Sequence, residues 1–566
     1  MSSCRPVVYG TRHVVASGHY LASLAGFQIL EAGGNAVDAG VAAGIALSVL
    51  ESELVSFAGV APIILYCADR DEIVSISGLG TWPRAASADY FRDNHAGKIP
   101  PGILRTVVPA APDAWITALE RYGTLGFADV SAAAIGYAAE GFHMYPLMAD
   151  LIAKHRDDYD AYESSRAIYL PGGKVPEVGS LFRQTDLAAT LRYMAEEDRA
   201  AARKGGRGAG LEAARHAFYK GDIAERIAAF HRDEQGFLTL DDLAGFAVGV
   251  EPSVSISFGD AEVHGCGAWC QGPMLLQALK ILEGYDLKEL GHNSAAYLHL
   301  VVEAVKLAAA DRERFYGDPR FVEVPLSRLL SADYAAARRK LIDPDKAWSD
   351  LPPAGDAMTA SATNAGPENT GSAMDTTYVC VVDRHGNAFS ATPSDASYNA
   401  PVVPGLGFVA SPRGSQSWAD PSHPSSLVPG KRPRLTPNPA LALTRDRIIP
   451  FGSPGGDVQT QAMLQALLNL LVFDFDVQAA VEAPRVASYS FPSSFQPHES
   501  EPGVLRMEAR LPDDVAADLQ AKGHSVEAWP GFTWLAGSVS MIDADRGPGT
   551  RRGGSDPRRA GYAVGW

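Results

Sequence analysis

A pair of threonines begins the most clearly patterned stretch of this 566-residue chain. After a small, polar run that ends at Asp375, residues 377–382 read Thr-Tyr-Val-Cys-Val-Val, and such β-branched and aromatic side chains are typical of a buried strand. The turn sequence Asp-Arg-His-Gly-Asn follows over 383–387, and residues 388–392 have the pattern of a returning strand. The pattern predicts a β-hairpin with Thr376 at its beginning.

A threonine in this place can act as a nucleophile if the peptide bond before it is cut. Thr376 would then carry a free α-amine, whose reference pKa of about 7.7 to 8 leaves a useful fraction unprotonated near neutral pH. That amine can accept the proton of the hydroxyl, so one residue would supply both the nucleophile and its base. On the pattern alone, a Thr-Thr pair that only opens a hairpin remains the ordinary alternative.

The composition is that of a globular protein and excludes several classes of partner. Apolar residues make up 46% and charged residues 20% of the chain, and no Pro/Ser-rich linker divides it into separate halves. The net charge of -17 argues against binding to nucleic acid or to an anionic membrane. No apolar run has the length of a membrane helix, and the first residues lack the apolar stretch of a signal peptide. We therefore expect a cytoplasmic protein that binds neither nucleic acid nor a membrane.

Five cysteines are too few and too scattered for a disulfide framework. Cys266 and Cys270 are four positions apart, but no histidine pair stands near them at ligand spacing. We expect neither a structural metal nor a cofactor.

Apolar periodicity and turn residues predict the other elements. Helices are expected over 17–30, 37–50, 111–122, 182–218, 297–312 and 458–473, and strands over 61–66, 73–76 and from 447 to a glycine turn at 456. Ser17 is the expected N-cap of the first helix, and Gly33-Gly34 its stop. The glycine-rich segment 203–210 is predicted to interrupt its helix as a flexible surface insertion, and 347–375 to be a mobile cleavage junction.

The segment from Thr376 to Ala388 resembles the beginning of the small subunit of γ-glutamyltranspeptidases, which are N-terminal-nucleophile hydrolases that cut their own precursor before a threonine. Further motifs resemble the same family, so the resemblance covers nearly the whole chain: 32–39, 236–243, 297–312 and 554–563. The resemblance implies that Thr376 is the nucleophile and Thr377 its structural neighbour. Ser394 stands where the family keeps a supporting hydroxyl, although a turn serine before Asp395 is an equally open interpretation.

The resemblance also implies that Gly455 and Gly456 form the oxyanion hole. Elementary physics agrees, because glycines let the backbone approach closely and the N-terminus of the following helix favours negative charge. A glycine turn that only precedes a helix is the plain alternative.

The residues that set specificity depart from the family pattern. The arginine that holds the glutamyl α-carboxylate in transpeptidases aligns with Leu79, and the acid that receives the α-ammonium aligns near Gln416. Other family positions are also changed: its asparagine falls on Ala396, a glutamine near Arg413, and two serines on Leu435 and Thr436. Arg413 and Arg434 are gained cations, a pattern that suits an acyl group with a carboxylate but no ammonium, because arginine binds carboxylates through two parallel hydrogen bonds.

The segments 413–424 and 429–434 look more like the amidohydrolase and acylase branch of the family, which includes oxamate amidohydrolases and cephalosporin acylases. A solvated, charged loop remains the alternative interpretation of the cations in these segments, which are Arg413, Lys431, Arg432 and Arg434.

Together these expectations describe an α+β protein with the four-layer αββα sandwich of the N-terminal-nucleophile hydrolases. Cleavage between Asp375 and Thr376 would separate a large-subunit region, 1–375, from a small-subunit region, 376–566, and the two fragments would form one compact heterodimer that could itself dimerise. The predicted function is hydrolysis of an amide of a small carboxylate-bearing substrate through an acyl-enzyme on Thr376, with substrate contacts from Arg413, Arg434 and Gln416.

Two alternatives remain open at this point. One is an authentic γ-glutamyltransferase or glutathione hydrolase, against which Leu79 argues. The other is an unprocessed, non-catalytic homologue that binds a small acid or a partner protein, against which the intact Thr376 and glycine pair argue.

Overall fold

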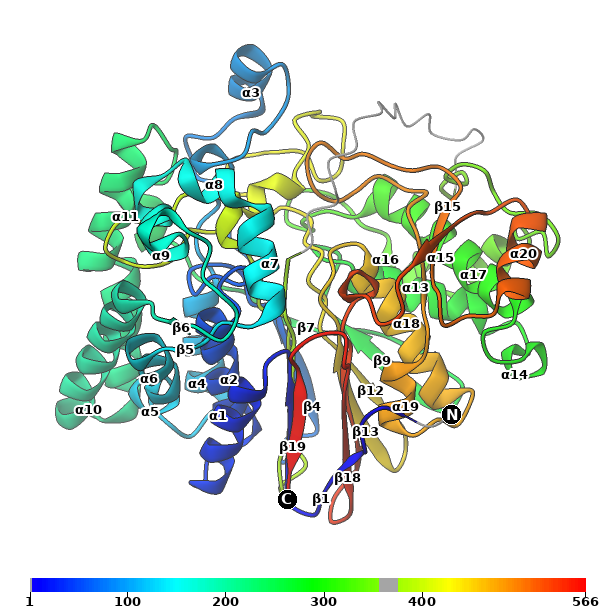
Figure 1. Cartoon of the computed structure of the whole chain (residues 1–566), viewed down its shortest axis with the longest axis horizontal. Helices are drawn as coiled ribbons and strands as arrows, with labels where there is room; N and C mark the ends of the chain where they lie inside the picture. Colours follow the sequence, from blue (N-terminus) through cyan, green and yellow to red (C-terminus); the bar gives the residue numbers. More distant parts are fainter. Residues whose placement is uncertain (1–2, 356–374) are drawn as a thin grey trace.

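The computed structural model describes residues 3–355 and 375–566. In this part of the chain two seven-stranded β-sheets face each other, and helices cover both outer sides (Figure 1). The four-layer αββα arrangement predicted from the sequence is therefore confirmed. Of the predicted cleavage junction 347–375, residues 356–374 lie outside the described residues.

All neighbouring strands of the two facing sheets are antiparallel. One sheet has the order β19 (Tyr562–Gly565), β2 (Val14–Ser17), β10 (Val379–Val382), β11 (Ala388–Ala391), β3 (Ile63–Cys67), β4 (Glu72–Ile76) and β7 (Val250–Pro252). The other has the order β1 (Val8–Gly10), β18 (Arg551–Ser555), β17 (Ser540–Asp545), β13 (Arg447–Gly452), β12 (Ala440–Leu443), β9 (Ala261–Gly265) and β8 (Val254–Phe258). Both sheets thus contain strands from before and from after Thr376, side by side.

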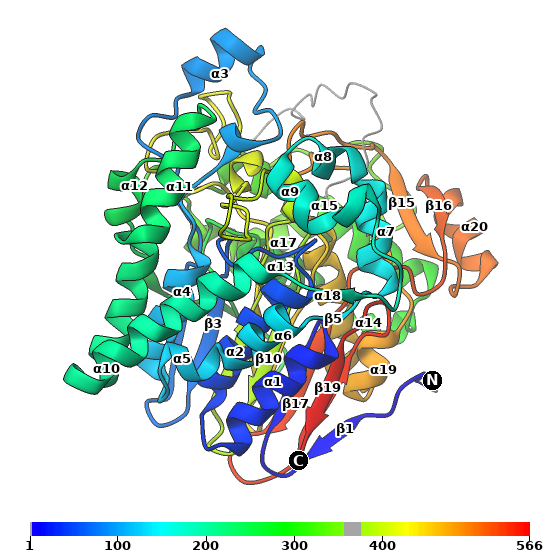
Figure 2. The same ribbon diagram turned by 60° about the vertical axis from the view of Figure 1, so that its left-hand side comes forward.

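Each outer layer of helices packs on one sheet. The layer over β10 and β11 contains α1 (Tyr20–Glu31), α2 (Ala36–Leu50), α4 (Ala111–Tyr122), α5 (Phe127–Val130), α6 (Ala132–Glu140) and α10 (Thr185–Tyr219). The layer over the second sheet contains α13 (Gly272–Leu282), α15 (Ala295–Phe315), α18 (Val458–Leu471) and α19 (Val477–Glu482). Figure 2 shows that α10 lies outermost, where it packs against α4, α5 and α6.

Smaller elements extend this body at its ends. Near the helical layer of the first sheet lie α3 (Ala88–His95), α7 (Pro146–Lys154), α8 (Arg156–Asp160), α9 (Glu163–Tyr169), α11 (Asp222–Asp233), α12 (Leu240–Ala244) and the strand pair β5 (Phe142–His143) and β6 (Leu181–Phe182). On the other side lie α14 (Leu287–Leu290), α16 (Leu326–Leu329), α17 (Ala332–Arg339) and α20 (Asp513–Ala521), with a small sheet of β14 (Val486–Ser488), β15 (Val504–Glu508) and β16 (Ser525–Trp529). No helix within the described residues is both long and apolar enough to cross a membrane.

The predicted hairpin forms the centre of the first sheet. Val379 pairs with Ala391 and Val382 with Ala388, so β10 and β11 are antiparallel neighbours as expected. Successive side chains of β10 alternate between two cores: Val379 and Val381 pack under the helices, whereas Cys380 packs between the sheets. Burial on both faces explains why the strand is apolar at every position.

Two local predictions need correction. Ser17 is not the N-cap of α1, because β2 continues through Ser17 and the side chain of His19 caps the helix instead. The helix is interrupted within 203–210 as predicted, because two helical parts of α10 meet at a kink at Gly206, but the residues on either side of the kink are helical and do not form an irregular insertion. Tertiary contacts outweigh the glycine content there: a Cβ on Gly210 would lie 2.2 Å from an Asp198 oxygen, and Arg207 donates to the Leu119 carbonyl at 2.9 Å.

Candidate active site

Thr376 is fully buried at the start of β10, where the two sheets approach each other closely. Gly452, the last residue of β13, makes this approach possible, because a Cβ there would lie 2.3 Å from the ring of Tyr378. The Thr376 amide donates to the Leu54 carbonyl at 3.1 Å, and Arg559 Nη1 donates to the Thr376 carbonyl at 2.7 Å. The backbone of Thr376 is therefore fixed on both sides, at a φ of 91° that is unusual for a β-branched residue.

Three polar side chains surround the Thr376 hydroxyl. Ser394 Oγ lies 2.7 Å from Thr376 Oγ1, the Asp375 carboxylate accepts from the hydroxyl at 2.9 Å, and Gln459 Nε2 lies at 3.4 Å. Arg413 Nη2 donates to Ser394 Oγ at 2.6 Å. Ser394 can therefore donate to Thr376, which leaves the Thr376 proton directed at Asp375. The structure brings the two predicted hydroxyl residues together.

Arg413 lies at the centre of a buried charge cluster. Its Nε donates to Asp395 Oδ1 at 2.7 Å, and its Nη2 donates to Asp375 Oδ2 at 2.7 Å. Burial raises the pKa of Asp395, although the Arg413 charge opposes this shift. Asp395 also has a positive φ, 99°, which is a strained backbone conformation for an aspartate and is of the kind that accumulates at functional sites. The alternative interpretation, that Arg413 stands in a solvated loop, is wrong, because its side chain is 1% exposed.

The predicted glycine pair forms the turn between β13 and α18. Gly455 and Gly456 are buried and have φ values of 121° and 56°, a region that glycine adopts without strain. No residue in the described part of the chain accepts a hydrogen bond from either amide. Buried amides usually have acceptors, so two that lack them are suited to an anion. Gln459, in the first turn of the following helix, connects this turn to Thr376.

Known proteins resemble this chain along nearly its whole length. The family model described as Gamma-glutamyltranspeptidase matches residues 22–566. The chain belongs to the gamma-glutamyltranspeptidase family. Among its relatives, the Acylase ACY 1 proenzyme of Pseudomonas sp. (strain SE83) is 34% identical over 547 residues, which cover 94% of this chain and 90% of that protein.

Solved structures of gamma-glutamyltranspeptidase relatives share the fold. The structure of LmbA2991HD is 37% identical with a TM-score of 0.93, and the match covers 100% of both chains. The cephalosporin acylase from Bacillus halodurans is 29% identical with a TM-score of 0.87, and the match covers 100% of this chain and 98% of that one. These likenesses confirm the N-terminal-nucleophile hydrolase fold, and the chain is an enzyme of the amidohydrolase and acylase branch of the family.

The residues that depart from the transpeptidase pattern have different surroundings in the structure. Leu79 is an apolar member of the core between the sheets. Gln416 is buried and paired with Thr436, whose hydroxyl accepts from Gln416 Nε2 at 2.8 Å. Arg434 Nη2 donates to Glu313 at 2.7 Å and Nη1 to the Arg312 carbonyl at 3.1 Å. Of the three predicted substrate contacts, Arg413 is therefore the one with a direct hydrogen bond to the Ser394–Thr376 pair.

Two buried acidic residues near Thr376, Glu51 and Glu53, were not predicted as part of the site. Glu51 and Glu53 follow α2, and Tyr145 Oη donates to Glu53 Oε1 at 2.6 Å. Burial, and then the neighbouring charge of Glu51, raise the pKa of Glu53 from 4.5 to about 8. Arg559, which binds the Thr376 carbonyl, opposes the shift. A sequence signal for them exists: the two acids lie between the apolar helix that ends at Leu50 and the apolar pair Leu54-Val55.

Replacing Glu53 by glutamine should stabilise the protein at pH 8 and have little effect near pH 5. The folded state holds the Glu53 proton more tightly than the unfolded chain, so this acid contributes stability below the unfolded pKa and loses it as pH rises through the folded pKa of about 8. Glutamine keeps the acceptor for Tyr145 without the charge. The measurement is the difference in Tm between Glu53→Gln and the wild type at pH 5, 6.5 and 8.

Glu225→Gln is the matched control for this comparison, because Glu225 is an exposed acid on α11. Its Tm difference from the wild type should not vary with pH. A Glu53→Gln difference that is equally flat would show that Glu53 is ionised in the folded protein across this range.

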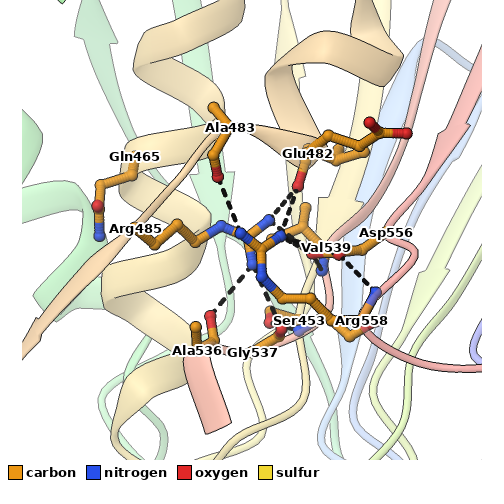
Figure 3. Close-up of polar contacts among 12 residues, drawn as sticks. Ser453, Gln465, Glu482, Ala483, Arg485, Ala536, Gly537, Val539, Asp556 and Arg558 are labelled. Atoms are coloured by element: carbon orange, nitrogen blue, oxygen red, sulfur yellow. Dashed lines mark hydrogen bonds and ion pairs between the residues drawn. The ribbon is translucent and has the colours of Figure 1, made fainter. Parts of the chain in front are cut away.

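A second buried network involves Arg485, Asp556 and Arg558 (Figure 3), and the last of these directly precedes Arg559 in the chain. Asp556 accepts from Arg485 Nη2 at 2.6 Å and from Arg558 Nη1 at 2.9 Å, and Arg558 also pairs with Glu508. Burial alone would raise the pKa of Asp556, but the charges of Arg558 and Arg485 outweigh it and hold the pKa below its usual value. The network therefore places Arg559 firmly behind the nucleophile.

One group of metal-type side chains lies away from this site, within the described residues. The ligand atoms of His299, Glu303 and His524 are within 4.8 Å of one another. Lys306 Nζ already donates to Glu303 at 2.8 Å, and His299 Nε2 contacts the Asp343 carbonyl at 2.8 Å. The ammonium of Lys306 supplies the positive charge here, so a buried ion pair with a chain of histidine hydrogen bonds explains the group.

Proposed function

We propose that this gamma-glutamyltranspeptidase relative is a self-processing threonine amidohydrolase that acts on an amide of a small, carboxylate-bearing substrate. The observation that carries the proposal is the position of the Thr376 hydroxyl. It contacts Ser394 at 2.7 Å and, through Gln459, the turn with two amides that lack acceptors among the described residues. The proenzyme name of the Pseudomonas relative is consistent with maturation by cleavage.

Self-cleavage would begin in the uncut chain, where the Thr376 nitrogen is an amide and cannot act as a base. The Asp375 carboxylate, 2.9 Å from Thr376 Oγ1, takes the hydroxyl proton while the oxygen attacks the Asp375 carbonyl carbon. The bond to the Thr376 nitrogen breaks, and that nitrogen receives the proton. Water then hydrolyses the resulting ester, which leaves Asp375 with a new carboxylate and Thr376 with a free amine. The backbone strain at Thr376, worth about 1 to 3 kcal/mol, favours this step.

Turnover would use the same hydroxyl with a different base. The new α-amine, positioned by the Leu54 carbonyl, accepts the Oγ1 proton during attack on a substrate amide. The amides of Gly455 and Gly456 stabilise the oxyanion, and each such donor is typically worth about 3 to 4 kcal/mol of the barrier. The amine product leaves with the proton, and water releases the acyl group. The two fragments remain together as a heterodimer.

A substrate carboxylate is proposed because Arg413 is the buried cation next to this hydroxyl pair. Arg413 pairs with Asp395 through Nε, but its buried Nη1 has no acceptor among the described residues, so the guanidinium can also bind a ligand carboxylate. An authentic γ-glutamyltransferase would also need an acidic side chain that binds the α-ammonium of the substrate. Leu79 and Gln416 are uncharged, so they do not provide the charges expected in a binding site for a zwitterion.

The test measures release of p-nitroaniline from three anilides by purified protein, with mass spectrometry of the chain in the same samples. We expect two fragments that meet between Asp375 and Thr376, and faster hydrolysis of an acidic acyl anilide than of a neutral acyl or γ-glutamyl anilide. A preference for the γ-glutamyl anilide would favour the transferase alternative. An intact chain without turnover would favour a non-catalytic homologue.

A further inference from the structure

The uncut chain already holds an acyl group in the proposed site. In self-cleavage the acyl half of the broken bond is Asp375, whose carbonyl carbon receives the Thr376 oxygen. The carboxylate of the same residue accepts from Arg413 Nη2 at 2.7 Å. Asp375 is 1% exposed, so this ion pair is sheltered from water. The chain itself therefore shows where an acidic acyl group is held when its carbonyl lies beside the nucleophile.

The guanidinium of Arg413 has the donors needed for a carboxylate-binding site. Asp395 occupies Nε, Ser394 shares Nη2, and Nη1 has no hydrogen-bond partner within the described residues. A guanidinium with an unused, buried donor next to an occupied one can bind a carboxylate through both nitrogens. The ring of Phe495 lies 5.4 Å from the guanidinium carbon and limits access of water.

Cleavage would change which charges face Arg413. In the uncut chain two carboxylates, Asp375 and Asp395, share one guanidinium. Asp395 lies within the segment after Thr376 and keeps its bond to Nε, whereas Asp375 becomes the end of the other fragment. Once Asp375 moves out, the nucleophile becomes accessible, Nη2 has lost one of its two carboxylate contacts, and Nη1 is still without an acceptor among the described residues. A substrate that brings one restores the charge balance of the uncut chain.

We propose that the substrate resembles Asp375 in the length of its acyl group. The enzyme hydrolyses amides in which two carbon atoms separate the scissile carbonyl from a carboxylate, as in succinyl and N-acylated α-aspartyl amides. This inference rests on the proposed function, because it takes Thr376 as the nucleophile for both reactions. In Asp375, Cα and Cβ separate the carbonyl from the carboxylate. A malonyl group is one carbon shorter, and glutaryl and γ-glutamyl groups are one carbon longer.

The site should discriminate between acyl groups of different length because it fixes both ends of the acyl group. The carbonyl must lie at Thr376 Oγ1, whose position is set by Ser394 and Gln459, and Arg413 is held by Asp395. A mismatch of one carbon displaces the carboxylate by more than the tolerance of a hydrogen bond. A butyryl group has the length of succinyl but leaves the buried guanidinium without its second carboxylate.

The deciding experiment compares four p-nitroanilides on the self-cleaved wild-type protein: malonyl, succinyl, glutaryl and butyryl. We expect kcat/KM for the succinyl anilide to exceed that for the malonyl and glutaryl anilides at least 10-fold and that for the butyryl anilide about 100-fold. Succinate should also inhibit competitively at concentrations at least 10-fold lower than glutarate. Equal or better hydrolysis of the glutaryl anilide overturns the inference, as does a butyryl rate equal to the succinyl rate.

The variant Arg413→Gln tests whether Arg413 binds the carboxylate of the acyl group. Its kcat/KM should fall for both anilides, because Arg413 also orients Ser394, but the fall should be much larger for the succinyl anilide, so that the ratio of the two values approaches one. If that variant does not cut itself, the acyl series and succinate inhibition of the wild type still decide the question.

The outcomes separate this inference from the proposed function. A cleaved protein that hydrolyses amides without a succinyl preference contradicts the acyl length alone. A protein that neither cuts itself nor hydrolyses any of the four anilides contradicts both.

Discussion

Replacing Thr376 by alanine should leave the chain as one 60.0 kDa polypeptide and lower amide hydrolysis by about 10⁴-fold or more. The variant lacks the oxygen that would attack both the Asp375 carbonyl and the substrate. The neighbouring amides and Arg413 remain, so the fold and part of the oxyanion stabilisation persist. Mass spectrometry of the purified chain and an anilide assay measure the two effects.

Two companion variants make the result specific. Thr376→Ser keeps a hydroxyl and should still cut itself, although more slowly. Asp375→Asn keeps the nucleophile but removes the carboxylate that accepts its proton, and loss of a general base typically slows a step about 10²- to 10⁴-fold. Fragments of normal size from Thr376→Ala, with normal turnover, would be incompatible with Thr376 as the nucleophile.

Replacing Asp556 by asparagine should lower the free energy of unfolding by about 3 to 5 kcal/mol. The substitution keeps the shape of the side chain but leaves Arg485 and Arg558, both buried, with Glu508 as the remaining acid of the network. The low pKa of Asp556 has the same cause: the two cations stabilise its charged form despite burial. Urea unfolding followed by circular dichroism measures the loss.

An exposed ion pair supplies the control. Asp474 and Lys288 are 2.6 Å apart, but their side chains are 74% and 65% exposed, so Asp474→Asn should hardly change the unfolding midpoint. A loss of the same size for both variants would show that burial does not set the contribution of the Asp556 network.

The local pattern of apolar and polar residues was sufficient to predict the helices and strands in which that pattern is regular. The hairpin of β10 and β11, helix α4 and helix α15 all lie where the sequence predicted them. The positions of Thr376, Ser394 and the glycine pair came from family motifs, and the structure brings Ser394 and Thr376 within 2.7 Å.

Contacts between distant segments could not be predicted in the same way. The alignment suggested Arg413 and Arg434 as equivalent cations, but their partners separate them: Arg413 contacts Asp375 and Asp395, whereas Arg434 pairs with Glu313 on α15. The helical conformation of α10 on both sides of its kink at Gly206 likewise depends on Asp198 and Arg207, whose contacts only the folded chain reveals.

The interleaving of strands gives the proposed cut an unusual consequence. β10 and β11 lie between β2 and β3, and in the other sheet β12 pairs with β9 and β18 pairs with β1, so in both sheets hydrogen-bonded neighbours come from opposite sides of the Asp375–Thr376 bond. A nicked molecule could release neither piece without dismantling both sheets. We expect the pieces to co-purify in the absence of denaturant, and a mixture of isotopically labelled and unlabelled nicked protein to show no exchange of pieces between molecules.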